Sequence, residues 1–249
     1  MAKYILFDTE TTGTLEEDKI IQIGGMIVSS KTDIECFDEL CSTNVPIKIE
    51  AMEVHNITPE LLSEKPCCQD TKFYKKIIEL NNNENYLIAH NVNFDLSMLQ
   101  KEGFENKFIP IDTLRCSKHL FPQLSHHRLQ YIRYALELYK DEQLEAEKLN
   151  ITIKAHDAIG DVLIMKLFLS KLVAKCFTLY PDINPMKKLA NLTQTPVIVK
   201  TFKFGKYKDR DIIDIAKEDL GYLNWMITNM KDLDEDIRYT INEAIQSIN

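Results

Sequence analysis

The sequence of 249 residues lacks an excess of positive charge, since its formal net charge at pH 7 is −8. This argues against a protein that coats nucleic acid through bulk charge, although a nuclease with an acidic metal site would still fit. The sequence also lacks any CxxC pair among its six cysteines, and Cys67 and Cys68 are adjacent. That spacing suits neither a zinc site nor a disulfide framework, so we expect free thiols in a reducing cytoplasm.

A long apolar stretch is missing as well. The first residues, MAKYILFDTETTG, carry a charge and then acidic residues, and no apolar run of membrane length follows them. We therefore expect no signal peptide and no membrane partner, and we predict a cytoplasmic protein. The composition is ordinary for a globular protein, with 45% hydrophobic and 27% charged residues, and internal repeats and low-complexity tracts are absent.

Apolar patterning predicts an α/β fold. Strands are predicted at residues 3–8, 20–28, 34–41, 86–89 and 108–111, and helices at 70–80, 94–102, 112–121, 128–140 and 158–176. Three strands, then alternating helices and strands, and then helices indicate a mixed sheet with helices packed on it. In the helix predicted at 128–140, Leu129, Ile132, Leu136 and Tyr139 recur at helical spacing and are expected to face the core.

The pattern weakens between two regular regions. Residues 177–195 contain Pro181, Pro185 and several asparagines, and we interpret them as a linker. The predicted organisation is a large domain at 1–176, this linker, and a small C-terminal α+β module at 196–249.

Two carboxylates stand at the end of the first predicted strand. Asp8 and Glu10 are two residues apart, so a strand places both side chains on one face. Carboxylate oxygens are the ligands that Mg²⁺ and Mn²⁺ prefer. A single DxE pair is weak support for a metal site, because strand ends are often acidic by chance.

Further acidic residues and a histidine follow at the starts of predicted helices. Asp95 follows AHNVNF, and KAHDAIGDVLIM contains His156 and Asp161. Five residues turn through about 500° on a helix, so His156 and Asp161 would not share one helical face. We therefore place His156 on the loop before the helix and Asp161 in its first turns, with Asp157 as the helix cap.

Three segments together resemble a known family. FDTETTG, AHNVNFDLSML and HDAIGD resemble the three signature motifs of the DEDDh (DnaQ-like) 3′→5′ exonucleases, in the same order. The five-residue spacing from histidine to aspartate resembles the histidine branch of that family. HNITPELL and IDTLRCSKHLFP resemble the segments that lie between and after the first two motifs. The resemblance covers residues 3–175.

The resemblance implies an RNase H-like fold and hydrolysis with two Mg²⁺ ions, for which Mn²⁺ could substitute. It implies that Asp8, Glu10 and Asp161 hold the first metal ion, and that Asp8 also touches the second, with support from Asp95. Two cations about 4 Å apart can stabilise both the attacking and the leaving oxygen of a phosphodiester. His156, with a reference pKa of about 6.5, suits a base that removes the proton from the attacking water.

The same resemblance implies contacts to the terminal nucleotide. They are expected from the backbone of Thr11, Thr12 and Gly13, from His55, and from Asn91 nearby. Leu15 could press on the terminal base, or it could be an ordinary apolar loop residue. His55 could instead be a polar residue that caps a nearby helix. The remaining histidines, 90, 119, 126 and 127, are expected at the surface or at helix starts.

Residues 200–210, KTFKFGKYKDR, alternate basic and aromatic side chains. Lys203, Lys206 and Lys208 could meet phosphates while the aromatic rings stack on bases; the alternative is a strand with a solvated basic face. The helical segment that follows contains the only tryptophan, Trp225, which we expect to pack in a small core. The TFxFGKY and GYLxW segments resemble the C-terminal module of exodeoxyribonuclease X, which favours DNA over RNA as the substrate.

These observations predict a DNA 3′→5′ exonuclease that acts on single-stranded or overhanging 3′ ends and releases nucleoside 5′-monophosphates, in repair or end processing. Two alternatives share the chemistry, namely an RNA-trimming exonuclease and a polymerase proofreading subunit. A third is a catalytically silent nucleic-acid-binding protein, although competent residue types occupy all five catalytic positions. The oligomeric state stays open, a homodimer included.

Overall fold

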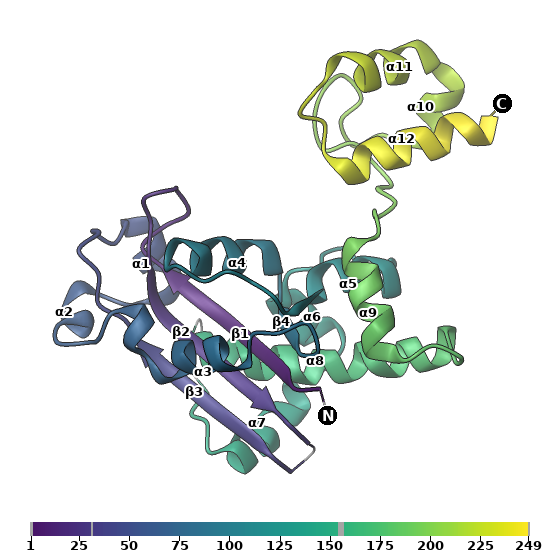
Figure 1. Cartoon of the computed structure of the whole chain (residues 1–249). Coiled ribbons are helices and arrows are strands. Elements are labelled where there is room, and N and C mark those ends of the chain that lie inside the picture. The colour runs from purple at the N-terminus through teal and green to yellow at the C-terminus, as the bar shows by residue number, and fades with distance from the viewer. Residues whose placement is uncertain (1, 31, 154–156, 249) are drawn as a thin grey trace. The chain divides into compact units, whose positions relative to one another are not determined.

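The computed structural model describes residues 2–30, 32–153 and 157–248 and divides the chain into two compact units, 1–193 and 194–249 (Figure 1). Five strands of the first unit form one sheet in the order β3-β2-β1-β4-β5. They are β1 (Tyr4–Thr11), β2 (Ile20–Val28), β3 (Ile34–Leu40), β4 (Tyr86–Ala89) and β5 (Ile109–Asp112). Strands β1, β2 and β3 pair antiparallel, whereas β4 is parallel to both β1 and β5. The mixed sheet predicted from the sequence is confirmed.

Helices connect and cover the strands. The first unit contains α1 (Ile49–His55), α2 (Pro59–Leu62), the short 3₁₀ helix η1 (Cys68–Asp70), α3 (Lys72–Leu80), α4 (Val92–Lys101), α5 (Thr113–Leu120), α6 (Leu129–Ala135), α7 (Tyr139–Leu149), α8 (Ala158–Leu179) and α9 (Pro185–Gln194). The second contains α10 (Ile212–Glu218), α11 (Leu220–Asn229) and α12 (Glu235–Ile248). No helix among the described residues is both long enough and apolar enough to cross a membrane.

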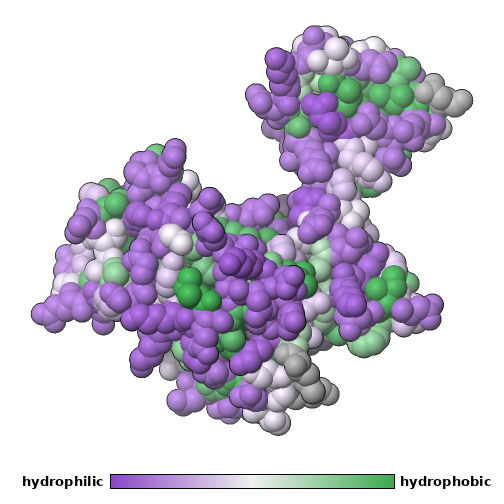
Figure 2. All heavy atoms as spheres, viewed as in Figure 1, coloured by the Kyte–Doolittle hydropathy of each residue, from purple (hydrophilic) through white to green (hydrophobic). Residues whose placement is uncertain are grey.

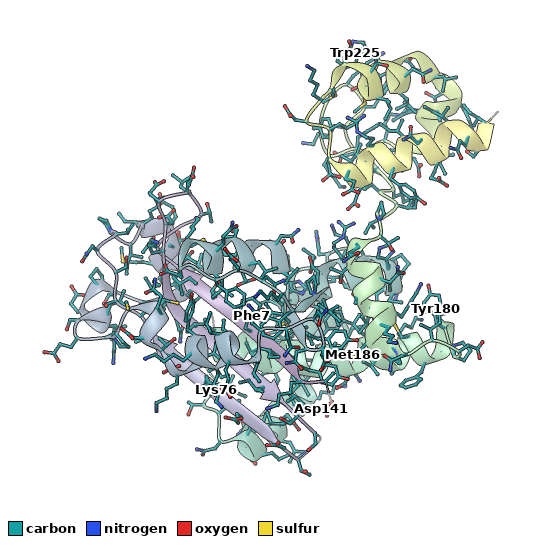
Figure 3. All side chains as sticks on the ribbon, in the orientation of Figure 1. Phe7, Lys76, Asp141, Tyr180, Met186 and Trp225 are labelled. Atoms are coloured by element: carbon teal, nitrogen blue, oxygen red, sulfur yellow. The ribbon has the colours of Figure 1, made fainter. Side chains whose placement is uncertain are left out.

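Side chains alternate between the two faces of the sheet and build a separate core on each. On β1, Leu6 belongs to the core that includes Phe168 of α8, whereas Ile5 and Phe7 belong to the core that includes Phe73 of α3. Figure 1 shows α3 and α8 on opposite sides of the strands, and Figure 3 labels Phe7. The period-two alternation of a strand therefore places successive residues of β1 in different layers.

The helix predicted at 128–140 is two helices. Helix α6 ends at Ala135, and Glu137 has a positive φ of 55°, which an uninterrupted helix does not accommodate. Leu129 and Ile132 are buried as expected, but Tyr139 begins α7 and is 43% exposed. The apolar residues keep their helical spacing across the turn between α6 and α7, so the spacing alone does not predict the break.

The linker predicted at 177–195 contains α9. Leu189 and Leu192 of this helix are buried in the α8-side core, so the contact boundary between the units falls after Thr193. Pro185 is the first residue of α9, a position where proline is favourable because its missing N–H has no partner in the helix. We had interpreted the proline as a sign of irregular structure, whereas it marks a helix start.

The second unit is mainly helical. Residues 200–210 do not form a strand: Thr201 and Asp211 make one isolated bridge, and Gly205 has a φ of +74°. The core of this unit includes Phe202 and Leu223, but Trp225 is 53% exposed, so the expectation that Trp225 packs in a core is wrong. Figure 3 shows Trp225 on α11 at the edge of its unit.

Candidate active site

The end of β1 presents the first pair of carboxylates. Asp8 is paired in register with Gly24 and Glu10 with Gln22, both on β2. Asp8 and Glu10 are partly buried, whereas Thr9 between them is buried and faces the opposite side of the sheet. The alternation of the strand therefore directs both carboxylates to one side of the sheet, as predicted.

Asp95 reaches this region from a distant part of the chain. It lies in the first turn of α4, which follows β4, the parallel neighbour of β1. Its Oδ1 accepts hydrogen bonds from the Thr9 amide at 3.1 Å and from the Thr9 hydroxyl at 2.7 Å. Asp95 is thus attached to the residue between Asp8 and Glu10. Thr9 was not singled out from the sequence, and no local signal distinguishes it.

Asp161 lies in the first turn of α8, where the sequence placed it. This helix starts directly against β2, because a Cβ on Gly24 would lie 2.6 Å from the backbone of both Ala158 and Ile159. Gly24 is also the register partner of Asp8. The absence of a side chain at this one position therefore allows the start of α8 to approach the strand pair that carries Asp8.

The electrostatics show that these four carboxylates act on one another. Burial, followed by the charges of Asp95, Asp161 and Glu10, raises the pKa of Asp8 well above its usual range. Burial and then Asp161 raise the pKa of Glu10 to about 8. Burial raises the pKa of Asp95 to about 7, against the opposing effect of the hydrogen bonds from Thr9. Negative charge is therefore costly here unless a cation offsets it.

The donor chemistry fits a divalent cation, since all four side chains offer hard oxygen atoms. Within 2–30, 32–153 and 157–248, however, no three or more Asp, Glu, His or Cys side chains are gathered closely enough to hold a metal ion. Two of the four carboxylates accept hydrogen bonds from neighbouring side chains. Gln130 Nε2 donates to Asp161 Oδ1 at 2.7 Å, and the Thr9 hydroxyl donates to Asp95 Oδ1 at 2.7 Å.

Gln130 was missed in the sequence. It lies on α6, and its Oε1 accepts a hydrogen bond from Arg133, which in turn pairs with the buried Glu142 of α7. This chain of contacts ties the orientation of the Asp161 carboxylate to the helices behind it. Only the packing of α6 beside α8 brings Gln130 to Asp161.

His156 lies outside the described residues, so its predicted position before α8 is not tested. Asp157 is at the N-cap position, but its side chain makes no capping hydrogen bond. Instead its Oδ1 accepts from Gln22 Nε2 at 2.6 Å, and its buried Oδ2 has no hydrogen-bond partner among the described residues. Asp157 therefore occupies the predicted position, but its side chain does not cap α8 and instead links the start of this helix to β2.

The segment from Thr11 to Gly13 is held by a carboxylate that the sequence did not reveal. Buried Asp18 accepts hydrogen bonds from the Thr12 hydroxyl at 2.8 Å, the Leu15 amide at 2.7 Å and Lys48 Nζ at 2.6 Å. A Cβ on Gly13 would lie 2.6 Å from Asp18 Oδ2, so glycine is required for this close approach. Burial would raise the pKa of Asp18, but the hydrogen bond from Lys48 and the others lower it.

Replacing Asp18 with asparagine is expected to destabilise the protein by about 1–3 kcal/mol at neutral pH, because buried donors lose a charged acceptor. The pKa of Asp18 is lower in the folded than in the unfolded state. Its contribution is therefore complete above the unfolded pKa of about 3.9 and is lost as the pH falls through the folded pKa. Denaturant unfolding at neutral pH and at pH 3 measures the difference. Asp141→Asn, at an exposed carboxylate labelled in Figure 3, should leave stability unchanged at both pH values; an equal loss in both variants would contradict the assignment.

The other predicted substrate contacts have mixed surroundings. His55 is buried: its Nδ1 accepts from the Ile57 amide at 2.9 Å, and its Nε2 has no partner among the described residues. Burial lowers the pKa of His55, which favours the neutral ring. Asn91 is exposed with a positive φ of 78°, and its backbone N–H donates to Asp112 Oδ1. Leu15 is 55% exposed and thus available for contact.

His90 directly precedes Asn91, the N-cap of α4, and is therefore one of the expected helix-start histidines, although it is partly buried. Its Nδ1 hydrogen-bonds with the Thr113 hydroxyl at 2.9 Å, and its Nε2 with the His127 carbonyl at 2.8 Å. His127 Nδ1 in turn hydrogen-bonds with Ser117. Burial lowers the pKa of His90. Both histidines therefore hold the β4–α4 connection, which carries Asn91, against α5.

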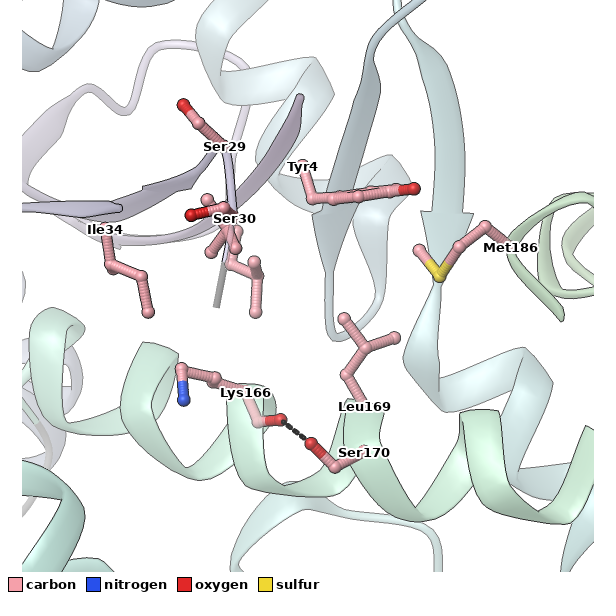
Figure 4. Close-up of a pocket in the computed structure, with 10 residues that line it drawn as sticks. Tyr4, Ser29, Ser30, Ile34, Lys166, Leu169, Ser170 and Met186 are labelled. Carbon is pink, nitrogen blue, oxygen red and sulfur yellow. Dashed lines mark hydrogen bonds between the residues drawn. The ribbon is translucent and has the colours of Figure 1, made fainter. Parts of the chain in front are cut away.

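A pocket of about 410 Å³ lies away from the carboxylates (Figure 4). Tyr4, at the other end of β1, lines it together with Ile34, Leu169 and Met186. Its lining is mainly apolar, and Lys166 at its edge is paired with Glu145. The visible face of the structure in Figure 2 is otherwise mostly hydrophilic. This apolar pocket and the four carboxylates are thus separate features.

Comparison with known proteins gives two family matches. The family model described as Exonuclease matches residues 5–168, and the model described as Exodeoxyribonuclease X-like C-terminal matches residues 202–231. Exodeoxyribonuclease 10 of Escherichia coli (strain K12) is 25% identical over 243 residues, which cover 97% of this chain and 98% of that protein. DNA polymerase III subunit epsilon of Treponema pallidum is 32% identical over 143 residues, covering 54% of this chain and 64% of that protein.

Solved structures agree with the fold. Exonuclease X in complex with 5′-overhanging duplex DNA superposes with a TM-score of 0.55 at 22% identity, covering 76% of this chain and 99% of that one. E. coli exonuclease I in complex with a dT13 oligonucleotide gives a TM-score of 0.53 at 19% identity, covering 73% of this chain and 43% of that one. At these identities the likeness establishes the RNase H-like fold that the sequence motifs implied.

Proposed function

Because the chain belongs to the exonuclease family whose model spans residues 5–168, we propose that it hydrolyses the terminal phosphodiester bonds of DNA in the 3′→5′ direction. The observation that carries this proposal is that the charges of Asp95 and Asp161, from distant parts of the chain, raise the pKa values of both Asp8 and Glu10. Such a cluster suits cation-assisted phosphodiester chemistry. The products are nucleoside 5′-monophosphates, and the role is DNA repair or end processing.

In the proposed mechanism, Asp8, Glu10 and Asp161 would hold one of two Mg²⁺ ions, and Asp8 with support from Asp95 would hold the other; Mn²⁺ could substitute. When bound, the cations stabilise the charge on the attacking and leaving oxygens. Thr9 and Gln130 orient Asp95 and Asp161 through the hydrogen bonds described above.

Proton transfer is assigned to His156. It takes the proton of the attacking water as the new oxygen–phosphorus bond forms and the bond from phosphorus to the 3′ oxygen breaks. A reference pKa of about 6.5 suits this role near neutral pH. His156 immediately precedes Asp157 in the sequence, and Asp157 Oδ1 accepts a hydrogen bond from Gln22 Nε2 of β2.

Substrate binding is proposed at the segment that Asp18 supports. The backbone of Thr11, Thr12 and Gly13 contacts the terminal nucleotide, with His55, Asn91 and Leu15 around it. Lys203, Lys206 and Lys208 of the second unit contact phosphates further along the strand; all three are exposed.

The preference for DNA over RNA rests on the second unit. The likeness to exodeoxyribonuclease 10 covers 97% of this chain and 98% of that protein, whereas the likeness to DNA polymerase III PolC-type of Clostridium perfringens covers 93% of this chain but only 15% of that protein. A protein similar to exodeoxyribonuclease 10 along both units fits a self-contained DNA exonuclease better than a polymerase proofreading subunit.

The proposal is tested by degradation of matched DNA and RNA oligonucleotides, single- and double-stranded, labelled at the 5′ end. With Mg²⁺, DNA carrying a single-stranded 3′ end should yield a ladder of progressively shorter labelled products, and EDTA should abolish it. Immediate release of the label as a mononucleotide would indicate the opposite polarity, and faster loss of RNA would assign the enzyme to RNA trimming.

A further inference from the structure

The second unit exposes an aromatic side chain that its own core does not use. Trp225 of α11 is more than half exposed, although tryptophan is highly buried on average. It stacks on Tyr222, one turn earlier, with ring centroids 6.1 Å apart and an interplanar angle of 26°. Leu223 and Met226 of the same helix face the core. Trp225 therefore points away from the hydrophobic contacts that hold α11.

Cations lie beside Tyr222 and beside its aromatic neighbour Tyr207. Tyr222 contacts Tyr207 edge to face at 5.0 Å, and Lys206 Nζ lies 4.6 Å and 5.8 Å from the centroids of Tyr207 and Tyr222. The Arg210 guanidinium lies 5.5 Å from the Tyr207 ring. Basic groups beside exposed rings are the combination that binds single-stranded nucleic acid, because phosphates meet the charges while bases stack.

The arrangement is held in place before any ligand binds. Asp219, at the N-cap of α11, accepts hydrogen bonds from Tyr207 Oη at 2.7 Å, Lys206 Nζ at 3.1 Å and the Tyr222 amide at 3.1 Å. Gly205 lets the loop pass the Tyr222 ring, since a Cβ there would lie 2.9 Å from Tyr222 Oη. A surface whose rings are already fixed loses little conformational entropy on binding.

The charges near the rings are partly compensated within the unit. Asp219 pairs with Lys206, Glu218 with Arg210, and Asp209 with Lys203. Two further exposed lysines, at 200 and 208, make no ion pair with any residue that the structure describes. The segment 200–210 therefore keeps net positive charge for phosphates.

The surroundings of Trp225 favour a nucleic acid over a protein partner. Its exposed neighbours on α11 are Gly221, Asn224, Thr228 and Asn229, which are small or polar. The apolar centre of a protein interface requires a contiguous patch around its aromatic anchor. A single stacking ring with polar and basic neighbours instead matches a base followed by its phosphate.

We propose that the Trp225–Tyr222 surface is a second binding site, at which a base of single-stranded DNA stacks on Trp225 while Lys206 and its neighbours contact the backbone. This site is separate from the carboxylate cluster and does not depend on the proposed hydrolysis. It would retain the strand that the nuclease unit shortens.

The test uses the full chain carrying Asp8→Asn, so that DNA is not degraded, with Mg²⁺ present. Trp225 is the only tryptophan, so fluorescence excited selectively at tryptophan, and not at the ten tyrosines, reports on this site alone. Adding a 20-residue oligo(dT) should quench the fluorescence saturably, and the affinity should fall with salt. In the same background Trp225→Ala should weaken oligo(dT) binding about 5- to 100-fold by fluorescence anisotropy.

Two variants make the result specific. Trp225→Phe should restore binding to within about threefold, because phenylalanine still stacks. Phe177→Ala, at another exposed aromatic (58% exposed) on α8, should not change it. Circular dichroism confirms that each variant is folded. Unchanged affinity in Trp225→Ala, or binding without any change in tryptophan fluorescence, would overturn the proposal. Neither readout depends on DNA cleavage, so failure of the proposed exonuclease activity would appear separately, in the degradation assay.

Discussion

Replacing Asp8 with asparagine is expected to reduce DNA degradation by at least about a thousandfold, which corresponds to about 4 kcal/mol of transition-state stabilisation. In the proposed mechanism Asp8 would help to hold both cations, so its loss would weaken the binding of each. The rate of 3′ shortening of 5′-labelled single-stranded DNA at saturating Mg²⁺ measures the effect.

Asp8→Asn should not lower the thermal stability of the metal-free protein, although it lowers the rate of degradation. Burial and the charges of Asp95, Asp161 and Glu10 disfavour the charged form of Asp8, so the neutral asparagine removes an unfavourable interaction from the metal-free fold. Without metal, Asp8→Asn should therefore melt at the same temperature as the wild type or higher. A cation that binds only the folded state stabilises it by mass action, so Mg²⁺ should raise the melting temperature of the wild type more than that of Asp8→Asn.

Asp141→Asn serves as the control for Asp8→Asn, because it removes an exposed carboxylate without touching the cluster. It should keep both the activity and the Mg²⁺-dependent rise in melting temperature. A wild-type rate of degradation in Asp8→Asn would remove Asp8 from the mechanism. An unchanged response to Mg²⁺ would place the cation elsewhere.

Replacing Gly24 with alanine is expected to impair both folding and catalysis. The new Cβ would lie 2.6 Å from the backbone of Ala158 and Ile159, and backbone cannot rotate aside as a flexible side chain can. Helix α8 must shift, and Asp161 shifts with it. Overpacking costs about 1–3 kcal/mol. A displacement of about 1 Å at a catalytic group can cost about a hundredfold in rate.

Gly25 provides a matched comparison for Gly24, one residue along the same strand. A Cβ on Gly25 would meet the ring of Phe73 on α3, on the opposite face of the sheet. Gly25→Ala should therefore lose stability while the turnover of the folded fraction changes little. Denaturant unfolding and kcat, measured for both variants, separate the two effects. Equal losses of kcat in Gly24→Ala and Gly25→Ala would show that α8 placement is not the cause.

Local patterns determined several features of this protein in advance. Apolar runs predicted all five strands, because burial on a sheet requires continuous or alternating apolar residues. The DxE pair at the end of β1 and the helix-start positions of Asp95 and Asp161 follow from the same patterns, and the motif resemblance connected them to one family. Such signals depend on near neighbours in the chain and are therefore readable without a structure.

The tertiary structure alone decided how these pieces meet. Gly24 admits α8 beside β1, Gln130 reaches Asp161 from another helix, and Asp18 supports the segment at Thr11 to Gly13. The break before α7, the helix in the supposed linker and the exposure of Trp225 likewise depend on which surfaces pack together. Contacts between residues far apart in the sequence produce no periodic pattern in the sequence from which they could be predicted. The sequence therefore determined which residues could perform the chemistry, and only the fold decided which side chains position them.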